Sequence, residues 1–317
     1  MNWVENDKRP LIILTGPTAA GKTELSLGLA KNIGGEIVSA DSMQVYRGMD
    51  IGTAKIKPEQ MQGIPHHLID VLNPDEEFNV SIFKDLAVQA IEGIYSRGNI
   101  PVLTGGTGFY IQAVLYDVPF ENTVSDSSYR QELEAYAEKK GVLSLHAMLA
   151  DIDPKSAEAI HPNNIKRVIR AIEYFSQTGE RISDHNEEAR AGKPAYNFKY
   201  FVLSVPREIL YPRIDRRVDI MREEGLEDEV RALKEKGYGR ELVSMQGIGY
   251  KELLAAFDGE YSIDTAFDKI KQGTRHFAKR QFTWFGRERG VTWVNKEEFK
   301  SGSGLLEFIT DETKKLL

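Results

Sequence analysis

The segment GPTAAGKT, residues 16–23, contains the residues of this 317-residue chain that are most specific for a chemical task. It fits the pattern G-x-x-x-x-G-K-[ST], and it stands between an apolar run typical of a buried strand, LIILT at 11–15, and a helical pattern. In that setting backbone N–H groups surround a diphosphate, the Lys22 ammonium adds positive charge, and the Thr23 hydroxyl can bind Mg²⁺. Because the loop accepts any diphosphate, ATP and other diphosphate compounds both stay open as its ligand.

Asp41 directly follows a second strand-like run, EIVSA at 36–40. Ligands of open α/β sheets bind outside the carboxyl ends of the strands, so we expect this carboxylate beside the glycine loop. It could bind Mg²⁺ through water, cap a turn, or accept a proton from a nucleophile. The residues alone leave these three roles open.

A second glycine-rich turn, GGTGFY at 105–110, follows the apolar run IPVLT at 100–104. Its glycines permit close approach of the backbone to a ligand, and Thr107 offers a hydroxyl. The alternative is an ordinary strand-to-helix turn. Kinases and ATPases with this kind of loop usually hold Mg²⁺ with an acidic residue, whereas this strand ends in Thr and Gly. The set of residues for phosphate hydrolysis is therefore incomplete.

Positive charge gathers near the end of the chain, although the net charge of the whole chain is −7. A helical pattern from Ser262 has an apolar side, formed by Phe267, Ile270, Phe277 and Trp284. The nearly opposite side carries three cations, Lys271, Arg275 and Lys279. Cations spaced by four residues repel one another unless an anion lies alongside, so we expect a phosphate backbone there. A second basic run, IKRVIRAI at 165–172, contains Lys166, Arg167 and Arg170.

The order of patterns predicts an α/β protein with a P-loop NTPase-like, doubly wound parallel sheet and an inserted all-helical domain. Strand and helix patterns alternate up to about residue 118, only helices are indicated over 119–196, and FKYFVLSV at 198–205 returns to a buried strand. We therefore assign 1–118 and 197–317 to the α/β core and 119–196 to the insertion. The absence of cysteine excludes disulfides, thiolate nucleophiles and Cys-ligated zinc.

Six motifs together resemble the family of tRNA dimethylallyltransferases, also called tRNA isopentenyltransferases. They are GPTAAGKT, DSMQVY, GGTGFY, RIDRRVDIM followed by GLEDEV, QGIGYKE, and AKRQFTWF, in this order and over nearly the whole chain. The resemblance implies transfer of a dimethylallyl group from dimethylallyl diphosphate to N6 of the adenosine 3′ of the anticodon in tRNA. The product is N6-isopentenyladenosine and the leaving group is diphosphate, which explains a phosphate loop without a hydrolytic set.

The resemblance also implies roles for individual residues. Asp41 accepts a proton from the adenine amine, Thr107 and Lys22 act on the diphosphate, and Arg130 and Arg217 assist the diphosphate or orient the RNA. The diphosphate lies on the loop residues Gly16, Pro17, Thr18, Ala19, Ala20, Gly21, Lys22 and Thr23, with Mg²⁺ at Thr23. The tRNA, through its anticodon stem-loop, contacts Asp41, Ser42, Met43, Gln44, Thr107, Arg130, Lys166, Arg167, Val168, Ile169, Arg170, Gln246, Gly247, Lys271, Arg275, Lys279, Arg280 and Gln281.

Three other functions could use a phosphate loop of this kind. A small-molecule ATP-dependent kinase explains the phosphate loop but leaves the basic helix without a task. A nucleotide-gated binding module is disfavoured because the N-K-x-D guanine motif is missing; NKEE at 295–298 lies far downstream and ends in Glu. Prenylation of free adenine nucleotides is disfavoured by the insertion and the basic helix. We expect a cytoplasmic monomer that has no obligate protein partner and does not enter a membrane.

Overall fold

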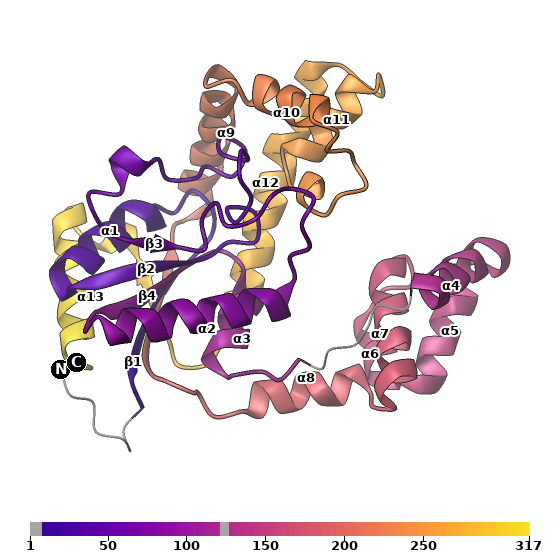
Figure 1. The fold of residues 1–317 in the computed structure, drawn as a ribbon, viewed down its shortest axis with the longest axis horizontal. Coiled ribbons are helices and arrows are strands. Elements are labelled where there is room, and N and C mark those ends of the chain that lie inside the picture. Colours follow the sequence, from indigo (N-terminus) through magenta and orange to yellow (C-terminus); the bar gives the residue numbers. More distant parts are fainter. Residues whose placement is uncertain (1–7, 121–126) are drawn as a thin grey trace. The chain divides into compact units, whose positions relative to one another are not determined.

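The computed structural model describes residues 8–120 and 127–317 (Figure 1). Within these residues six parallel strands form one sheet in the order β3-β2-β4-β1-β5-β6, which confirms the predicted α/β class. The strands are β1 (Pro10–Thr15), β2 (Gly35–Ala40), β3 (His66–His67), β4 (Ile100–Gly105), β5 (Asn197–Ser204) and β6 (Val291–Asn295).

Helices cover both faces of the sheet, as a doubly wound fold requires. Ile12 and Leu14 of β1 are buried in one core cluster with residues of α1 and α13. Because side chains alternate along a strand, Leu11 and Ile13 point to the opposite face, where α2 and α3 lie (Figure 1). These four helices are α1 (Lys22–Ile33), α2 (Val80–Ser96), α3 (Gly108–Leu115) and α13 (Gly302–Lys314).

The register of the three central strands brings their ends to one level. Thr15 of β1 and Ala40 of β2 both pair with Gly105 of β4. The chain therefore leaves the sheet at the same edge three times, into the glycine loop, into Asp41 and into the GGTG turn. Strand β4, which leads into the GGTG turn, lies directly beside β1.

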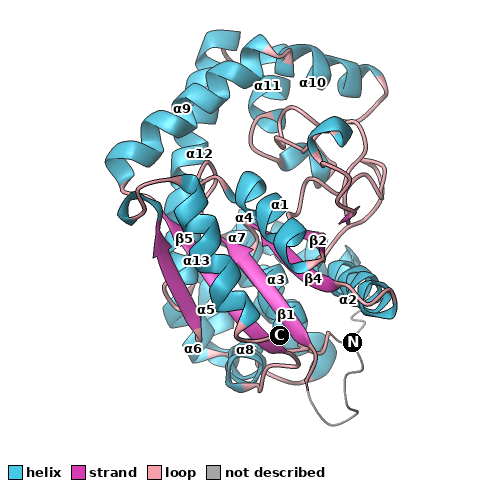
Figure 2. Cartoon of the chain, turned by 90° about the vertical axis from the view of Figure 1, so that its left-hand side faces the viewer, coloured by secondary structure: helices cyan, strands magenta, loops and turns pink. Residues whose placement is uncertain are grey.

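Further helices stand beyond this edge, with α9 and α12 packed along each other (Figure 2). Helix α12 begins at a Ser262 cap, whose hydroxyl accepts from the Thr265 backbone N–H at 3.2 Å. These elements are α9 (Arg207–Glu223), α10 (Leu226–Glu235), α11 (Tyr250–Phe257) and α12 (Ile263–Phe285), with short 3₁₀ turns at η1 (Pro58–Gln60), η2 (Ser244–Gln246) and η3 (Lys296–Glu298).

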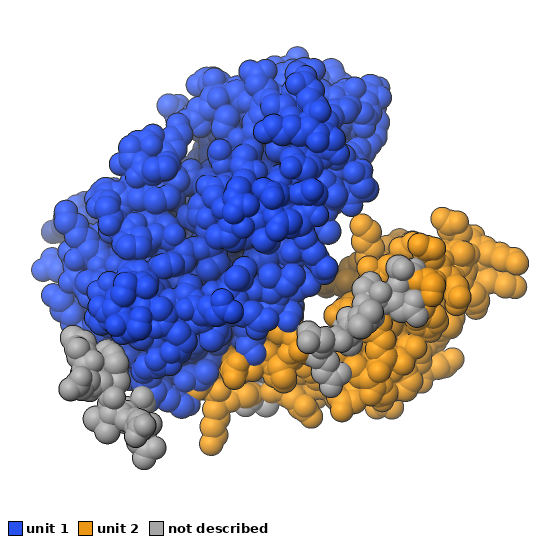
Figure 3. Space-filling model, viewed as in Figure 1, with its two compact units in different colours: residues 1–115, 195–317 blue, residues 116–194 orange. Residues whose placement is uncertain are grey.

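The chain divides into two compact units, 1–115 with 195–317, and 116–194 (Figure 3). At the seam, the Ala195 N–H donates to the Leu115 carbonyl at 2.7 Å. The second unit is helical in its described residues and has a core of its own around Leu145, Leu149 and Ile172. Its helices are α4 (Ser127–Lys140), α5 (Val142–Ile152), α6 (Pro154–Ala159), α7 (Ile165–Thr178) and α8 (Ile182–Ala191). None of the described helices of either unit is both long and apolar enough to span a membrane.

Candidate active site

The glycine loop leads directly into the first turn of α1. Gly21, the residue before the helix, has φ +85°, a left-handed conformation that glycine adopts without strain. The Lys22 ammonium folds back onto the loop and donates to the carbonyls of Gly16 at 3.0 Å and Pro17 at 2.8 Å. Its hydrogen bonds go to neutral carbonyls, so its charge is left for an anion bound at the loop.

The charge of Lys22 is held in a partly desolvated place. Burial, together with the nearby Arg217 guanidinium, lowers the pKa of Lys22 to about 8, and Asp41 acts in the opposite direction. Burial likewise lowers the pKa of Arg217, which extends from α9 and makes no hydrogen bond within the described residues. Two cations therefore share one carboxylate at this edge of the sheet.

Asp41 uses one carboxylate oxygen to shape its own turn. Its Oδ1 accepts from the backbone N–H groups of Met43 at 2.9 Å and Gln44 at 3.3 Å. Its Oδ2 accepts no hydrogen bond from the part of the chain that the structure describes. Of the three roles considered for Asp41, turn capping is therefore present in the structure, and one oxygen stays available for a proton or a cation.

A cavity of about 320 Å³ opens beside this edge. Asp41, Thr18, Thr107 and Arg217 line it together, and the Thr107 hydroxyl makes no hydrogen bond within the described residues. The remaining lining residues are Ser42, Met43, Gly52, Thr53, Val218, Met221, Leu226, Gln246, Gly247, Ile248, Gly249, Tyr250, Lys251, Ile270, Thr274, Phe277 and Arg280. Polar groups from three strand ends thus meet an apolar wall from α9 and α12, as a ligand with a charged head and an apolar body requires.

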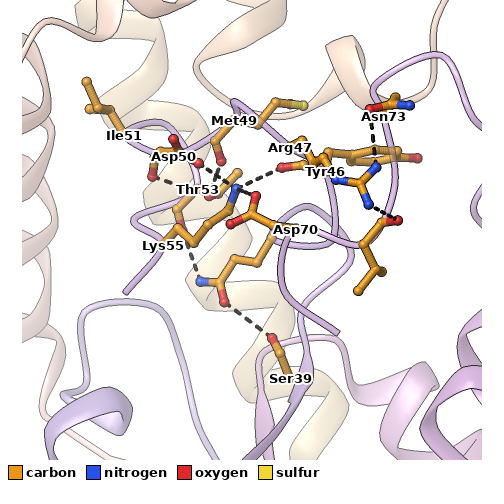
Figure 4. Close-up of polar contacts among 12 residues, drawn as sticks. Ser39, Tyr46, Arg47, Met49, Asp50, Ile51, Thr53, Lys55, Asp70 and Asn73 are labelled. Atoms are coloured by element: carbon orange, nitrogen blue, oxygen red, sulfur yellow. Dashed lines mark hydrogen bonds and ion pairs between the residues drawn. The ribbon is translucent and has the colours of Figure 1, made fainter. Parts of the chain in front are cut away.

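The segment after Asp41 is held in place by a buried lysine (Figure 4). Lys55 has a side chain only 4% exposed, and its ammonium donates to Asp50 and Asp70 at 2.6 Å each and to the Tyr46 carbonyl at 2.7 Å. A lysine paired with two carboxylates in this way fixes a loop that has little regular structure of its own. The loop thereby gains one defined path along the cavity.

Gln44 and Glu229 complete this framework. The Ser39 hydroxyl donates to Gln44 Oε1 at 3.2 Å, and Gln44 Nε2 donates to the Thr53 carbonyl at 3.2 Å (Figure 4). The amide of Gln44, expected on an RNA contact, is therefore used within the chain. Glu229 of α10 accepts from the N–H groups of residues 50, 51 and 52 at 2.7–3.1 Å and from the Tyr250 hydroxyl at 2.6 Å.

Helix α12 differs from the sequence interpretation in one respect. Lys271 pairs with Asp219 at 2.5 Å, and Arg275 pairs with Asp215. Both aspartates lie on α9, so the anion expected beside these two cations is supplied by the chain itself. The argument that they need a phosphate backbone is therefore wrong. Lys279 and Arg280 are exposed without an ion pair in the described residues, and Arg280 reaches the cavity.

Gln281 also occupies a place that the sequence did not indicate. It is 4% exposed, and both ends of its amide are hydrogen-bonded to the two glycine-rich loops. A direct contact of this side chain with RNA, as the resemblance implied, would require the amide to leave this buried position. Gln246 and Gly247 do line the cavity.

The predicted RNA residues of the second unit fall into two groups. Lys166, Arg167 and Arg170 are exposed on α7 and have no ion pair within the described residues. Val168 and Ile169, 0% and 2% exposed, belong to the core of the unit, so their side chains cannot reach RNA. The sixth residue, Arg130, belongs to neither group and donates from Nε and Nη2 to Glu173 at 3.0 and 2.6 Å.

Some residues of the site were missed or misjudged from the sequence. Tyr250 and Glu229 lie within the quoted motifs QGIGYKE and GLEDEV, so the motifs themselves carried the signal. Lys296 was set aside because NKEE lies far along the chain. A Cβ built on Gly21 would come 2.6 Å from the Lys296 ammonium, so β6 returns this lysine to the glycine loop. Within the described residues it has no ion pair.

The oxygen donors near the loop suit Mg²⁺. Thr23 and Asp41 line a smaller cavity of about 60 Å³ together with Ser26, Ser39 and Thr104. Mg²⁺ prefers such hard oxygen ligands and usually keeps waters and phosphate oxygens as well. No cluster of three or more His, Asp or Glu side chains suited to a metal occurs among the described residues.

Comparison with known proteins agrees with this geometry. Family models described as IPP transferase and isopentenyl transferase match residues 44–288 and 10–73. A tRNA dimethylallyltransferase of Lachnoclostridium phytofermentans is 59% identical over 298 residues, which cover 94% of this chain and 95% of the relative. One from Bacillus pumilus is 48% identical, with coverages of 92% and 91%.

Solved structures extend the similarity to the fold. The full-length tRNA isopentenylpyrophosphate transferase of Bacillus halodurans has a TM-score of 0.71 at 45% identity, over 98% of this chain and 99% of that one. A eukaryotic dimethylallyltransferase acting on tRNA has a TM-score of 0.80 at 27% identity, over 98% of this chain and 80% of that one. The chain therefore belongs to the tRNA dimethylallyltransferase (IPP transferase) family and is an enzyme of that activity.

Proposed function

We propose that this enzyme transfers a dimethylallyl group from dimethylallyl diphosphate to N6 of the adenosine 3′ of the anticodon in tRNA, with release of diphosphate. The observation that carries this proposal is one cavity in which the glycine loop, Asp41, Thr107 and Arg217 meet an apolar wall. The loop and its cations suit the diphosphate, and the wall suits a prenyl chain and a base.

The loop serves the leaving group. When the carbon–oxygen bond of the allylic diphosphate breaks, its electron pair goes to the diphosphate and positive charge develops on the prenyl carbon. The loop N–H groups, Lys22 and the Thr107 hydroxyl stabilise that negative charge. The barrier falls because these interactions become stronger as the charge develops in the transition state. Arg217 adds a second cation. Thr23 would hold Mg²⁺, and the ion would supply further charge neutralisation for the diphosphate.

Asp41 serves the nucleophile. The exocyclic amine of adenine is weak because its lone pair is delocalised into the ring, so bond formation is helped by a group that accepts a proton from N6. Oδ2 of Asp41 accepts no hydrogen bond within the described residues, while Oδ1 keeps the carboxylate in place. The target base leaves the anticodon stack to reach this carboxylate, which costs a few kcal/mol that RNA contacts must offset.

The RNA contacts follow the exposed cations. Lys166, Arg167 and Arg170 on α7, and Lys279 and Arg280 on α12, have no carboxylate partner within the described residues and suit phosphates. Ser42, Met43, Gln246 and Gly247 line the cavity where the extruded base would lie. Arg130 orients RNA only if it gives up Glu173, and the monomeric, cytoplasmic state stays a prediction of the sequence.

The test supplies labelled dimethylallyl diphosphate with Mg²⁺ to unmodified tRNA and, in a separate reaction, to AMP. We expect label in tRNA alone, recovered after digestion as N6-isopentenyladenosine. A tRNA in which the adenosine 3′ of the anticodon is replaced by guanosine is the matched control and should stay unlabelled. Label in AMP, or turnover of ATP at the rate of a kinase without label in RNA, would contradict the proposal.

A further inference from the structure

Gln281 of α12 joins the two glycine-rich loops at the edge of the sheet. The Thr18 backbone N–H donates to its Oε1 at 2.9 Å, and its Nε2 donates to the Gly106 carbonyl at 2.9 Å. The side chain comes from 263 residues beyond the first loop and 175 residues beyond the second. The side chain is 4% exposed, and its hydrogen bond to the Gly106 carbonyl is buried while that from the Thr18 N–H is partly buried, so water competes little for either.

The glycines of the second loop are explained by this helix. A Cβ on Gly106 would come 2.2 Å from Gln281 Nε2, and one on Gly108 would come 2.1 Å from the Trp284 ring. Sequence analysis attributed these glycines to the close approach of a ligand. In the structure the side chains of α12 occupy that space, so the glycines permit the helix to touch the loop backbone directly.

Both loops present a side chain to the cavity next to the point that Gln281 holds. Thr18 is one hydrogen-bond partner of Gln281, and Thr107 directly follows the other partner, Gly106. The strands below are joined as well, since the Thr15 hydroxyl donates to the Gly105 carbonyl at 2.6 Å.

We propose that Gln281 is a positioning residue for the transfer step, which holds the glycine loop and the Thr107 turn at the spacing at which both act on the diphosphate leaving group. The inference rests on the proposed function of these loops. It differs from a role in RNA contact, because both ends of the amide are already bonded within the chain. An error of about 1 Å in such positioning can lower a rate on the order of 100-fold.

The test compares Gln281→Met, which keeps the length of the side chain and loses both hydrogen bonds, with the wild-type chain. Gln272→Met is the matched control, since Gln272 is exposed on the same helix. At saturating tRNA and dimethylallyl diphosphate we expect Gln281→Met to lower the single-turnover rate by about 10- to 100-fold. The Kd for tRNA should change by less than about twofold, because the side chain makes no RNA contact.

A double-mutant cycle separates positioning from a loss of fold. In a Thr107→Ala background the hydroxyl to be positioned is gone, so Gln281→Met should lower the rate by less than about threefold. Equal losses in both backgrounds would show a merely structural role and overturn the inference. A raised Kd for tRNA with an unchanged rate at saturation would overturn it in favour of RNA contact.

Gln281→Glu is the second variant, to be measured if Gln281→Met does not unfold cooperatively and its lower rate could reflect a loss of fold. It keeps the acceptor for Thr18 and faces the Gly106 carbonyl with an oxygen, so the same loss of rate is expected, and wild-type behaviour would contradict the inference. Absence of transfer by the wild-type chain would overturn the proposed function as well. Transfer by the wild-type chain together with full activity of both Gln281 variants would overturn this inference alone.

Discussion

The edge of the sheet and the α9–α12 helix pair both contain cations, but the groups that surround these cations differ. On the helices, Lys271 and Arg275 each have an aspartate of α9 as partner. At the sheet edge, Lys22 donates to backbone carbonyls, Arg217 makes no hydrogen bond within the described residues, and the two cations share the one nearby carboxylate of Asp41. A cation with a carboxylate of its own is already compensated, whereas two cations that share one carboxylate keep a net positive charge that attracts an incoming anion.

The neighbours of each charged residue predict how strongly that residue should affect function. Residues at the edge of the sheet should act on chemistry or on the diphosphate. Uncompensated cations on the surface should act on RNA affinity in proportion to their number. Compensated cations should contribute mainly to the packing of their helices. A charge pattern in the sequence gives the number of cations, and only their neighbours show which of them a ligand can use.

The largest effect is expected for Asp41→Asn. The amide oxygen keeps the hydrogen bonds to Met43 and Gln44, and the ability to accept a proton is lost, so the single-turnover rate should fall by about 10²- to 10⁴-fold with little change in tRNA affinity. Asp75→Asn, at an exposed position of the same unit, is the control and should leave the rate unchanged. A rate near that of the wild type would exclude Asp41 as the base.

Lys22 should make diphosphate binding depend on pH. Its pKa is lowered to about 8, so the cationic form is lost as the pH rises through that value, and affinity for inorganic pyrophosphate should fall over the same range. Lys22→Met should bind about 10- to 100-fold more weakly at pH 7, as expected for the loss of charge-assisted hydrogen bonds. Calorimetry at several pH values checks both points.

A comparison of the wild type with Lys22→Met also separates the titration of Lys22 from the titration of pyrophosphate. Pyrophosphate gains and loses protons in the same way with both proteins, so any difference between their pH profiles of affinity comes from Lys22. The same lowered pKa means that the unfolded chain, with a lysine pKa near 10.4, binds more protons above pH 8. The ligand-free wild type should therefore gain stability relative to Lys22→Met as the pH rises from about 8 to 10. If the free energies of unfolding of the two proteins changed with pH in parallel, the lowered pKa could not belong to Lys22.

Smaller effects are expected on α7. Alanine at Lys166, Arg167 or Arg170 should each flatten the salt dependence of tRNA binding by about 0.7–0.9 in log–log slope, since each is exposed and uncompensated. Lys155→Ala is the control within the same unit, because Lys155 already pairs with Glu187 at 3.0 Å. Unchanged slopes in all three variants would place the RNA elsewhere.

The fold could be predicted largely because its signals are local. The glycine loop, the buried runs of β1, β2, β4 and β5, and the capped helices each lie within one short stretch of sequence. The strand β6, which was not recognised, lacks such a signal because it carries the half-polar sequence VTWVN at the edge of the sheet. A short edge strand depends on its neighbour more than on its own composition.

The site could be predicted only where its chemistry lies within one loop. Lys22, Asp41 and Thr107 each follow a strand, and strand ends meet at one edge by a general rule. The role of Gln281 and the compensation of Arg275 depend on residues 60 or more positions away, which one sequence does not connect. Lys296 was set aside for the same reason, since distance along the chain says nothing about distance across a sheet.

The smallest effects should come from Lys271 and Arg275, and they decide whether the comparison of the two regions holds. Alanine at either position should flatten the salt dependence of tRNA binding by less than about 0.3, whereas Lys279→Ala on the same helix should flatten it by about 0.7–0.9, because only Lys279 lacks an acidic partner in the described residues. The partly exposed pairs should instead contribute about 0.2–1 kcal/mol each to the free energy of unfolding. A double-mutant cycle of Lys271→Met with Asp219→Asn measures that contribution, and the double variant should be no less stable than either single variant. Equal slopes for Lys271→Ala and Lys279→Ala would show that RNA displaces the aspartate, and that a carboxylate neighbour does not remove a cation from the RNA-binding surface.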